Sequence, residues 1–320
     1  FSIRGTMDMS TENEIIFSIF HSISAFCNAG FSNLEGGLSN PRLLHGNQLV
    51  YVVAILLIST GSIGFPILVN IRDALMQKAS RIWHRLHHRK LRSRIVHSYT
   101  MNSKIVVTTW GLLFAAGTIL FWVLENNHSL AGMTPWEKLV QSMFNSVTPR
   151  SAGFSSVNPA GFLNVTLVMI LFLMWIGGAS QSTAGGIKVN TLASIWLNMK
   201  STITGARHTS AFCRTISIGS IRRANAVVAI SIFSYILYSI ILLLLEPDIP
   251  ARSLLFESCS ALFTVGSSLG ATPQLGTPAK ILLITAMFIG RVGIISLLSG
   301  LTRNRKDSAI RYPVDDIIIN

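Results

Sequence analysis

Charged side chains are scarce in this sequence of 320 residues, where Asp, Glu, Lys and Arg together make up 12%. A soluble domain carries about 25% of such residues. Half of the residues are hydrophobic, and the mean hydropathy is +0.52. A composition this poor in charge excludes an ordinary soluble domain and favours a protein embedded in a membrane.

Cysteines and acidic residues are also few. The three cysteines, Cys27, Cys213 and Cys259, form no CxxC pair, which argues against a zinc site or a disulfide framework. Acidic residues number 13 against 26 Lys and Arg. The basic residues gather in a few stretches and the acids in the linkers between them. This alternation follows the positive-inside rule, so we expect the basic stretches to be cytoplasmic and expect no nucleic-acid partner.

Long apolar runs predict the membrane-spanning segments. They are Leu49–Val69, Ile105–Leu124, Leu163–Ile176, Ala224–Leu245 and Ala279–Leu301. Most reach the roughly 20 residues that cross a bilayer, but Leu163–Ile176 is too short. The glycines and hydroxyls of Gly177–Gly186 follow it and interrupt what would otherwise be one long helix, so we expect a flexible polar loop there.

Three glycine-containing segments repeat along the chain: Ala25–Phe31, Pro149–Phe154 and Phe263–Ser267. Each follows a short amphipathic stretch and precedes a long apolar run. The short stretches, at residues 10–25, 136–145 and 251–262, predict helices too short to cross a bilayer. The repeating unit is therefore span, half-helix, loop and span, in two and a half copies.

The position of these loops predicts their chemistry. Non-helical backbone at membrane depth is tolerated where it is buried or lines a wet cavity. A half-helix that enters from outside points its partially negative C-terminal end at the membrane centre, which favours a cation there. Glycine permits the backbone angles that such a loop needs.

Five segments together carry a resemblance to a known family. Ser24–Ser32, Thr148–Phe154 and Ser260–Ser267 resemble the second, third and fourth filter segments of the Trk/Ktr/HKT superfamily of potassium transporters. Gly177–Lys188 resembles the intramembrane gating loop of that family, and Gly290–Gly293 resembles the arginine motif of its last helix. The chain is thus identified as similar to a TrkH/KtrB-like pore subunit, and we expect it to lack the first pore unit.

The resemblance implies an all-α integral membrane fold, with repeated helix–half-helix–filter loop–helix units around a pseudo-fourfold pore. It also implies a division of the chain. The parts are 1–71, the second half of pore unit 2; 72–104, a basic cytoplasmic loop; 105–199, pore unit 3 with the gating loop at 177–187; 200–223, a second basic loop; 224–302, pore unit 4; and 303–320, a cytoplasmic tail.

The resemblance further implies the site residues. The filter would be formed by Cys27, Asn28, Ala29, Gly30, Pro149, Arg150, Ser151, Ala152, Gly153, Phe263, Thr264, Val265 and Gly266. Potassium would be held by Asn28, Ala29, Gly30, Ser151, Ala152, Gly153, Thr264, Val265 and Gly266. Gating would involve Gly177, Gly178, Gly185, Gly186, Lys188 and Arg291.

Three basic side chains have more than one interpretation. Arg291, placed mid-span, either bars the ion path electrostatically or bonds to carbonyls of the gating loop. Lys188 either pairs with a carbonyl or, as we expect, snorkels to the cytoplasm. Arg150 either shapes the outer mouth or, as we expect, is anchored by Glu137 or Glu257. The tryptophans, Trp110 among them, are expected to be interfacial anchors.

These observations predict potassium uptake across the cytoplasmic membrane, with potassium as the transported ion and no organic cofactor in the chain. The alternative is a transporter of sodium, or of monovalent cations without discrimination. An intramembrane enzyme is the third possibility, but its nearest candidates, His21 and Cys27, have no intramembrane acid beside them. The resemblance implies a homodimer in membrane lipid and a cytosolic ring of nucleotide-binding regulatory subunits, TrkA/KtrA-like.

Overall fold

The structure is a computed structural model that describes residues 10–34, 36–86 and 100–293. Its elements are α1 (Thr11–Phe26), η1 (Gly37–Ser39), α2 (Pro41–Gly46), α3 (Gln48–Ile63), α4 (Phe65–Leu86), α5 (Met101–Glu125), α6 (Pro135–Val147), η2 (Pro159–Gly161), α7 (Asn164–Trp175), α8 (Val189–Ile203), β1 (Ser210–Ala211), β2 (Arg214–Thr215), α9 (Ile218–Leu245), α10 (Ala251–Leu262), η3 (Thr272–Gln274) and α11 (Thr277–Val292). The expected tail 303–320 and the end of the run Ala279–Leu301 lie outside the described residues.

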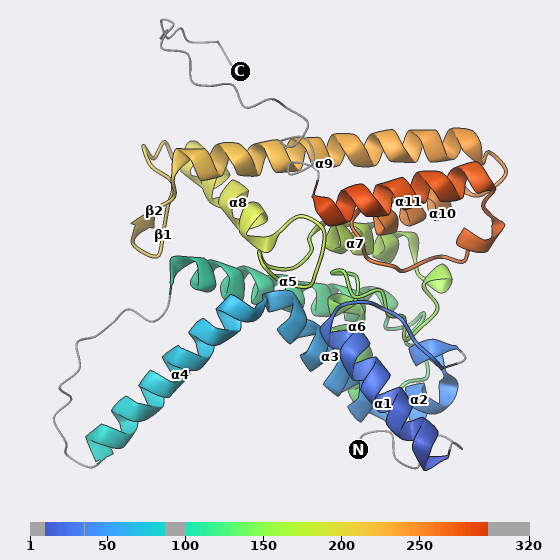
Figure 1. Ribbon diagram of the computed structural model, residues 1–320, viewed down its shortest axis with the longest axis horizontal. Coiled ribbons are helices and arrows are strands. Elements are labelled where there is room, and N and C mark those ends of the chain that lie inside the picture. The colour runs from blue at the N-terminus through green and yellow to red at the C-terminus, as the bar shows by residue number, and fades with distance from the viewer. Residues whose placement is uncertain (1–9, 35, 87–99, 294–320) are drawn as a thin grey trace, which may run out of the picture.

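Helices α5 and α9 are each long and apolar enough to cross a membrane. They expose large apolar side chains such as Val123, at 72%, and Leu244, at 76%. Such exposure would be costly in water and is favourable in lipid. Figure 1 shows α9 running the width of the molecule above α11 and α10.

The apolar run Leu49–Val69 does not form one continuous helix. Helix α3 ends at Ile63, and α4 leaves it at a bend of 102°. Gly64 forms the bend with φ +86°, an angle that favours glycine. A Cβ there would lie 3.0 Å from the backbone oxygen of Gln181, which itself belongs to the loop after α7. Residues 72–86, which we expected in a loop, belong to α4.

The three short helices are present as α1, α6 and α10. Helix α6 begins in a capping box, in which the Thr134 backbone N–H donates to the Glu137 carboxylate at 2.8 Å and Pro135 occupies the first turn. Helix α1 is capped by Ser10, and α10 begins after Pro250. Their 16, 13 and 12 residues make each too short to cross a bilayer.

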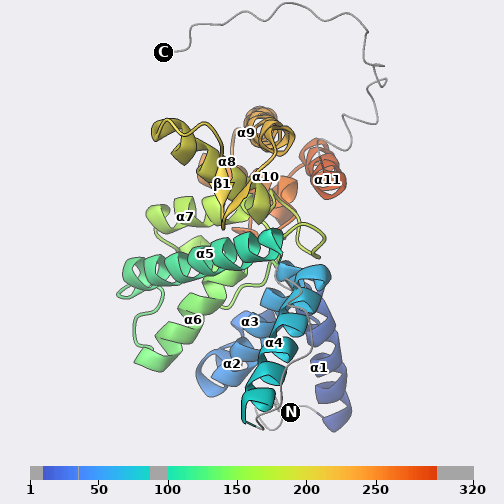
Figure 2. The ribbon, with the colours of Figure 1, turned by 90° about the vertical axis from the view of Figure 1, so that its left-hand side faces the viewer.

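Buried side chains join each unit to the next. One cluster connects α1, α3 and α6 through Phe17, Tyr51 and Phe144. Another connects α5, α7, α9, α10 and α11 through residues such as Phe121 and Leu254. Figure 2 shows α1–α4 at one end, α9–α11 at the other and α5–α7 between them. Groups of helices that follow one another in the chain are therefore also neighbours in space.

The long helix expected over residues 163–199 is interrupted as the glycines predict. Helix α7 ends at Trp175 and α8 begins at Val189. Between them the chain folds back, so that the Gly177 N–H donates to the Ile187 oxygen at 2.9 Å. We call residues 176–188 the intramembrane loop.

We expect Gly64→Ala to lower the free energy of unfolding by about 1–2 kcal/mol, because Ala disfavours the left-handed region and its Cβ approaches the Gln181 oxygen. Gly111→Ala in α5 is the matched control, since a Cβ at Gly111 meets no atom within 4 Å. Thermal unfolding in detergent micelles measures both. Equal stability of the two variants would contradict the role assigned to the bend.

Candidate ion pathway

The three filter segments share one backbone conformation. In each, the glycine and the residue two positions before it have positive φ. The pairs are Asn28 (51°) with Gly30 (76°), Ser151 (74°) with Gly153 (73°), and Thr264 (54°) with Gly266 (94°). Positive φ is strained for a residue with a Cβ, and such strain clusters at functional sites. The segments are therefore structural copies of one another.

The segments also lie side by side. A Cβ on Gly30 would lie 2.5 Å from the Ala152 oxygen, and a Cβ on Gly153 would lie 2.2 Å from the Val265 oxygen. Each of these glycines thus abuts the residue that precedes the next filter glycine. A side chain at either position would push into neighbouring backbone, so glycine is required by packing as well as by φ.

Hydroxyl groups at the ends of the half-helices hold the segments. Ser24 Oγ accepts from the Phe31 N–H at 3.0 Å, and Ser260 Oγ accepts from the Gly266 N–H at 3.1 Å. Thr148 Oγ1 donates to the Phe154 oxygen at 2.6 Å. Each segment is therefore fixed to the C-terminal end of its own half-helix, whose partial negative charge favours a cation.

The intramembrane loop contacts the filter segments directly. Asn28 Nδ2 donates to Thr183 Oγ1 at 3.0 Å, and the Gly185 N–H donates to Ser151 Oγ at 2.7 Å. A Cβ on Gly185 would lie 1.7 Å from Thr264 Oγ1. One loop thus lies against all three segments, and Gly185 is needed for the closest approach.

Two basic side chains bond to carbonyls of the loop. Arg291 Nη1 donates to the Thr183 oxygen at 2.9 Å, and Lys188 Nζ donates to the Ala184 oxygen at 2.6 Å. The expectation that Lys188 snorkels was wrong, because the ammonium is held within its own loop. Arg291 thus makes the bond to a loop carbonyl that was one of its two expected interactions.

The expected anchoring of Arg150 by Glu137 or Glu257 was also wrong. Glu137 belongs to the capping box, and Glu257 accepts from Thr272 and from the Leu269 N–H. Arg150 is 1% exposed, and its guanidinium carbon lies 4.5 Å from the centre of the Trp110 ring. Its charge therefore faces an aromatic ring of α5. Trp110 is accordingly a packing partner of the third segment, where we had expected an interfacial anchor.

Sequence reasoning missed Gly61, and it noted Gly290 only as part of the arginine motif; these two glycines bring α3 and α11 close to the half-helices. A Cβ on Gly61 would lie 2.0 Å from the Phe26 oxygen, and one on Gly290 would lie 1.9 Å from the Leu262 oxygen. Both oxygens stand four residues before a filter glycine. The available signal was the spacing in Gly61-Ser-Ile-Gly64, which repeats that of Gly290-Arg-Val-Gly293.

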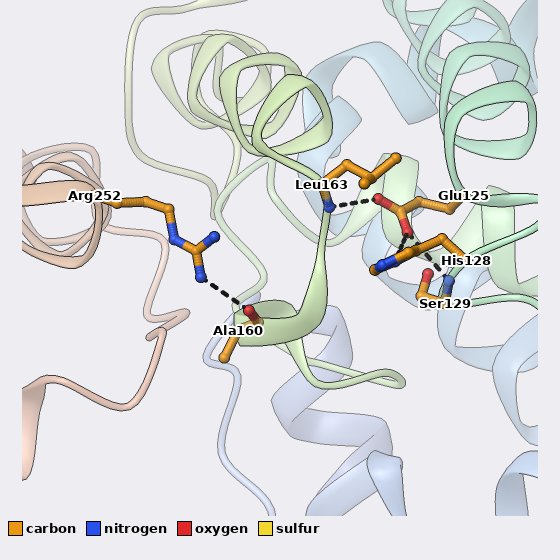
Figure 3. Close-up of polar contacts among 6 residues, drawn as sticks. All are labelled: Glu125, His128, Ser129, Ala160, Leu163 and Arg252. Carbon is orange, nitrogen blue, oxygen red and sulfur yellow. Dashed lines mark hydrogen bonds and ion pairs between the residues drawn. The ribbon is translucent and has the colours of Figure 1, made fainter. Parts of the chain in front are cut away.

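A buried carboxylate fixes the C-terminal end of α5. Glu125, at the end of α5 and fully buried, accepts from the Leu163 N–H at 3.0 Å and from the Ser129 N–H at 3.3 Å. Figure 3 shows these contacts, with His128 on the same carboxylate and Arg252 of α10 bonded to Ala160. The described residues contain no group of His, Cys, Asp and Glu suited to a metal ion.

Comparisons with known proteins place the chain in a family. The family model TrkH, described as a cation transport protein, matches residues 4–306. The potassium/sodium uptake protein NtpJ of Enterococcus hirae is 35% identical over 95% of this chain and 64% of its own length. The Ktr system potassium uptake protein B of Bacillus subtilis is 32% identical over 99% of this chain and 66% of its own length.

A solved structure has the same fold. The crystal structure of the potassium transporter TrkH from Vibrio parahaemolyticus matches with a TM-score of 0.67 and 20% identity, over 89% of this chain and 58% of that one. The chain spans slightly less than two thirds of the length of the curated relatives named above.

We expect Glu125→Gln to lower the free energy of unfolding by about 1–3 kcal/mol. The two carboxylate oxygens serve different backbone N–H groups, so whichever way the amide turns, one N–H loses its acceptor. Glu137→Gln is the control, because one amide oxygen suffices for its single bond to Thr134. Thermal unfolding in detergent compares them, and an equal loss in both would contradict the assignment.

Proposed function

The chain belongs to the TrkH family of cation transport proteins, and we propose that it lines a pore for potassium uptake. The observation that carries the proposal is the set of three adjacent segments with one repeated backbone conformation. Carbonyl oxygens in such a ring can replace the hydration shell of a cation. The transported ion would be held by residues 28–30, 151–153 and 264–266.

Glycine at all three filter positions supports potassium as the preferred ion, since the family resemblance associates filter glycines with potassium. Three relatives are named as potassium uptake proteins of Ktr systems, and one as a potassium/sodium uptake protein. The last name keeps a sodium or non-selective transporter as the second candidate.

The intramembrane loop is proposed as the gate. It lies against the three segments: Asn28 and Arg291 each donate one hydrogen bond to it, and its Gly185 N–H donates one to Ser151 Oγ. Two further backbone bonds, from Ala179 and Thr183, join it to the end of α3. A barrier held by a few such bonds can be displaced at modest cost. Energy for uptake would come from the ion gradient or from another subunit.

The assembly and orientation follow from the sequence pattern and the relatives. We place the chain as a multi-pass protein of the cytoplasmic membrane, with residues 72–104, 200–223 and 303–320 on the cytoplasmic side. We further propose a homodimer that works with a cytosolic nucleotide-binding regulatory subunit, as the family resemblance implies. The name of one relative as protein B of a Ktr system supports the presence of a further component. The divisions 1–71, 105–199 and 224–302 are proposed as pore units.

Flux through the full-length protein in proteoliposomes tests the pore. We expect rubidium or potassium flux that sodium competes with poorly, and we expect Gly153→Ser to weaken that selectivity because its Cβ displaces the Val265 carbonyl. Gly132→Ser is the matched control: Gly132 also has positive φ, +81°, but a Cβ there meets nothing within 4 Å.

Selectivity lost equally in both variants would contradict the filter role of Gly153. Sodium flux equal to potassium flux in the unaltered protein would favour the second candidate. If the folded protein gives no flux, adding the regulatory subunit distinguishes a missing activator from an incorrect pore assignment.

Two substitutions of Arg291 separate its two interpretations. Arg291→Ala removes both the charge and the bond to Thr183, and we expect flux to rise about tenfold if ~1.4 kcal/mol of closure is lost. Arg291→Gln removes the charge but keeps a donor. Higher flux in both variants supports an electrostatic barrier. Higher flux in Arg291→Ala alone supports the hydrogen bond to Thr183. Unchanged flux in both variants contradicts a gating role.

A further inference from the structure

Arg150 is a buried cation whose compensation comes from an aromatic ring. Its side chain is 1% exposed, and among the described residues Nε and Nη2 have no hydrogen-bond partner. Nη1 makes one long bond, 3.5 Å to the Trp110 oxygen. Because a buried charge without a partner is costly, the Trp110 ring 4.5 Å away is the contact on which the position of Arg150 depends.

Trp110 in turn is fixed by the end of α3. Its indole N–H donates to Ser62 Oγ at 3.3 Å, and the Ser62 hydroxyl donates to the Ser59 oxygen at 3.1 Å. The Ser62 hydroxyl therefore donates its proton to Ser59 and is left to act as an acceptor for the indole. The Trp110 ring also stacks on Phe114, with 5.4 Å between ring centres.

Ser62 also holds the intramembrane loop. Its backbone oxygen accepts from the Ala179 N–H at 2.8 Å. A Cβ on Gly178 would lie 2.6 Å from the same oxygen, so the loop approaches it closely. Ser62 and Ala179 are both buried, so water does not compete for this bond.

The third filter segment is thus connected to both ends of the loop. Ser151 reaches Gly185 directly at 2.7 Å. The adjacent Arg150 reaches Ala179 through Trp110 and Ser62. The consecutive residues Arg150 and Ser151 are therefore linked to two points of the loop, Ala179 and Gly185, which are six residues apart in the chain.

We propose that Trp110 is a positioning residue that couples the third filter segment to the intramembrane loop. Displacement of Ala179 from Ser62 disturbs the acceptor of the indole, the ring then shifts, and Arg150 carries the change into the backbone beside Ser151. Filter geometry depends in this way on the position of the loop. The transport consequence rests on the proposed pore function, but the physical link does not.

Hydrogen exchange of the full-length protein in detergent, followed by mass spectrometry, tests the link without transport. Trp110→Phe keeps an aromatic face for Arg150 but removes the N–H that binds Ser62. We expect amide exchange over residues 177–187 to become roughly threefold to tenfold faster, with a smaller increase over 148–154. Trp136→Phe, an exposed tryptophan of α6, is the control and should change neither segment.

Ser62→Ala removes the acceptor instead of the donor and should reproduce the effect of Trp110→Phe. The double variant should exchange no faster than either single variant, because both remove one interaction. Unchanged exchange over 177–187 in both single variants would overturn the proposal. So would additive effects, or acceleration of all segments alike, since either would indicate general loosening.

A flux measurement on the same variants separates this inference from the pore assignment. We expect Trp110→Phe to raise basal potassium flux and to weaken discrimination against sodium, while Trp136→Phe leaves both unchanged. Absence of flux in the unaltered protein with its regulatory subunit counts against the pore, while the exchange result still decides the link. Altered exchange with unaltered selectivity would overturn the coupling to the filter.

Discussion

The constraint on which this structure depends is the need to satisfy non-helical backbone at membrane depth. Three filter segments and one intramembrane loop leave helical geometry, and each supplies partners for another. The half-helix hydroxyls bind the segments, and Ser151 and Asn28 bind the loop. The last turn of α3 supplies carbonyls for the loop through Gly61 and Ser62. Backbone groups that cannot hydrogen-bond to lipid therefore lie together in one region, where they bond to one another.

Close backbone approach follows from that gathering. Side chains at Gly61, Gly153, Gly185 or Gly290 would meet neighbouring atoms at about 2 Å. These glycines differ in local conformation, since Gly153 has positive φ and the others do not. Each of them has an atom of another segment very close to it, and for three of the four glycines that atom is a backbone carbonyl oxygen. Packing between segments, more than flexibility within them, therefore explains the glycine content of this region.

The sequence predicted the short helices and the loops between them because run length and glycine spacing are local signals. The half-helices, the interruption after Trp175 and the resemblance of the filter segments were all visible in this way, and the family and fold agree with them. The bend at Gly64 was missed because the hydropathy of Leu49–Val69 continues across it. The partner of Arg150 was predicted wrongly because charge pairing suggested a carboxylate, whereas the fold brings Trp110 from 40 residues away. Contacts of that kind depend on how helices pack and leave no mark in composition. The ligand roles of the filter residues, the unit boundaries and the orientation stay predictions.

The three filter glycines differ in which neighbouring segment each one contacts. A Cβ on Gly30 would collide with the residue before Gly153, and a Cβ on Gly153 would collide with the residue before Gly266. A Cβ on Gly266 would have its nearest neighbour only at 3.9 Å. An added methyl group at one position therefore displaces the segment that follows it in the chain and spares the one that precedes it. The same substitution therefore has different structural effects at the three filter glycines, even though their backbone conformations match.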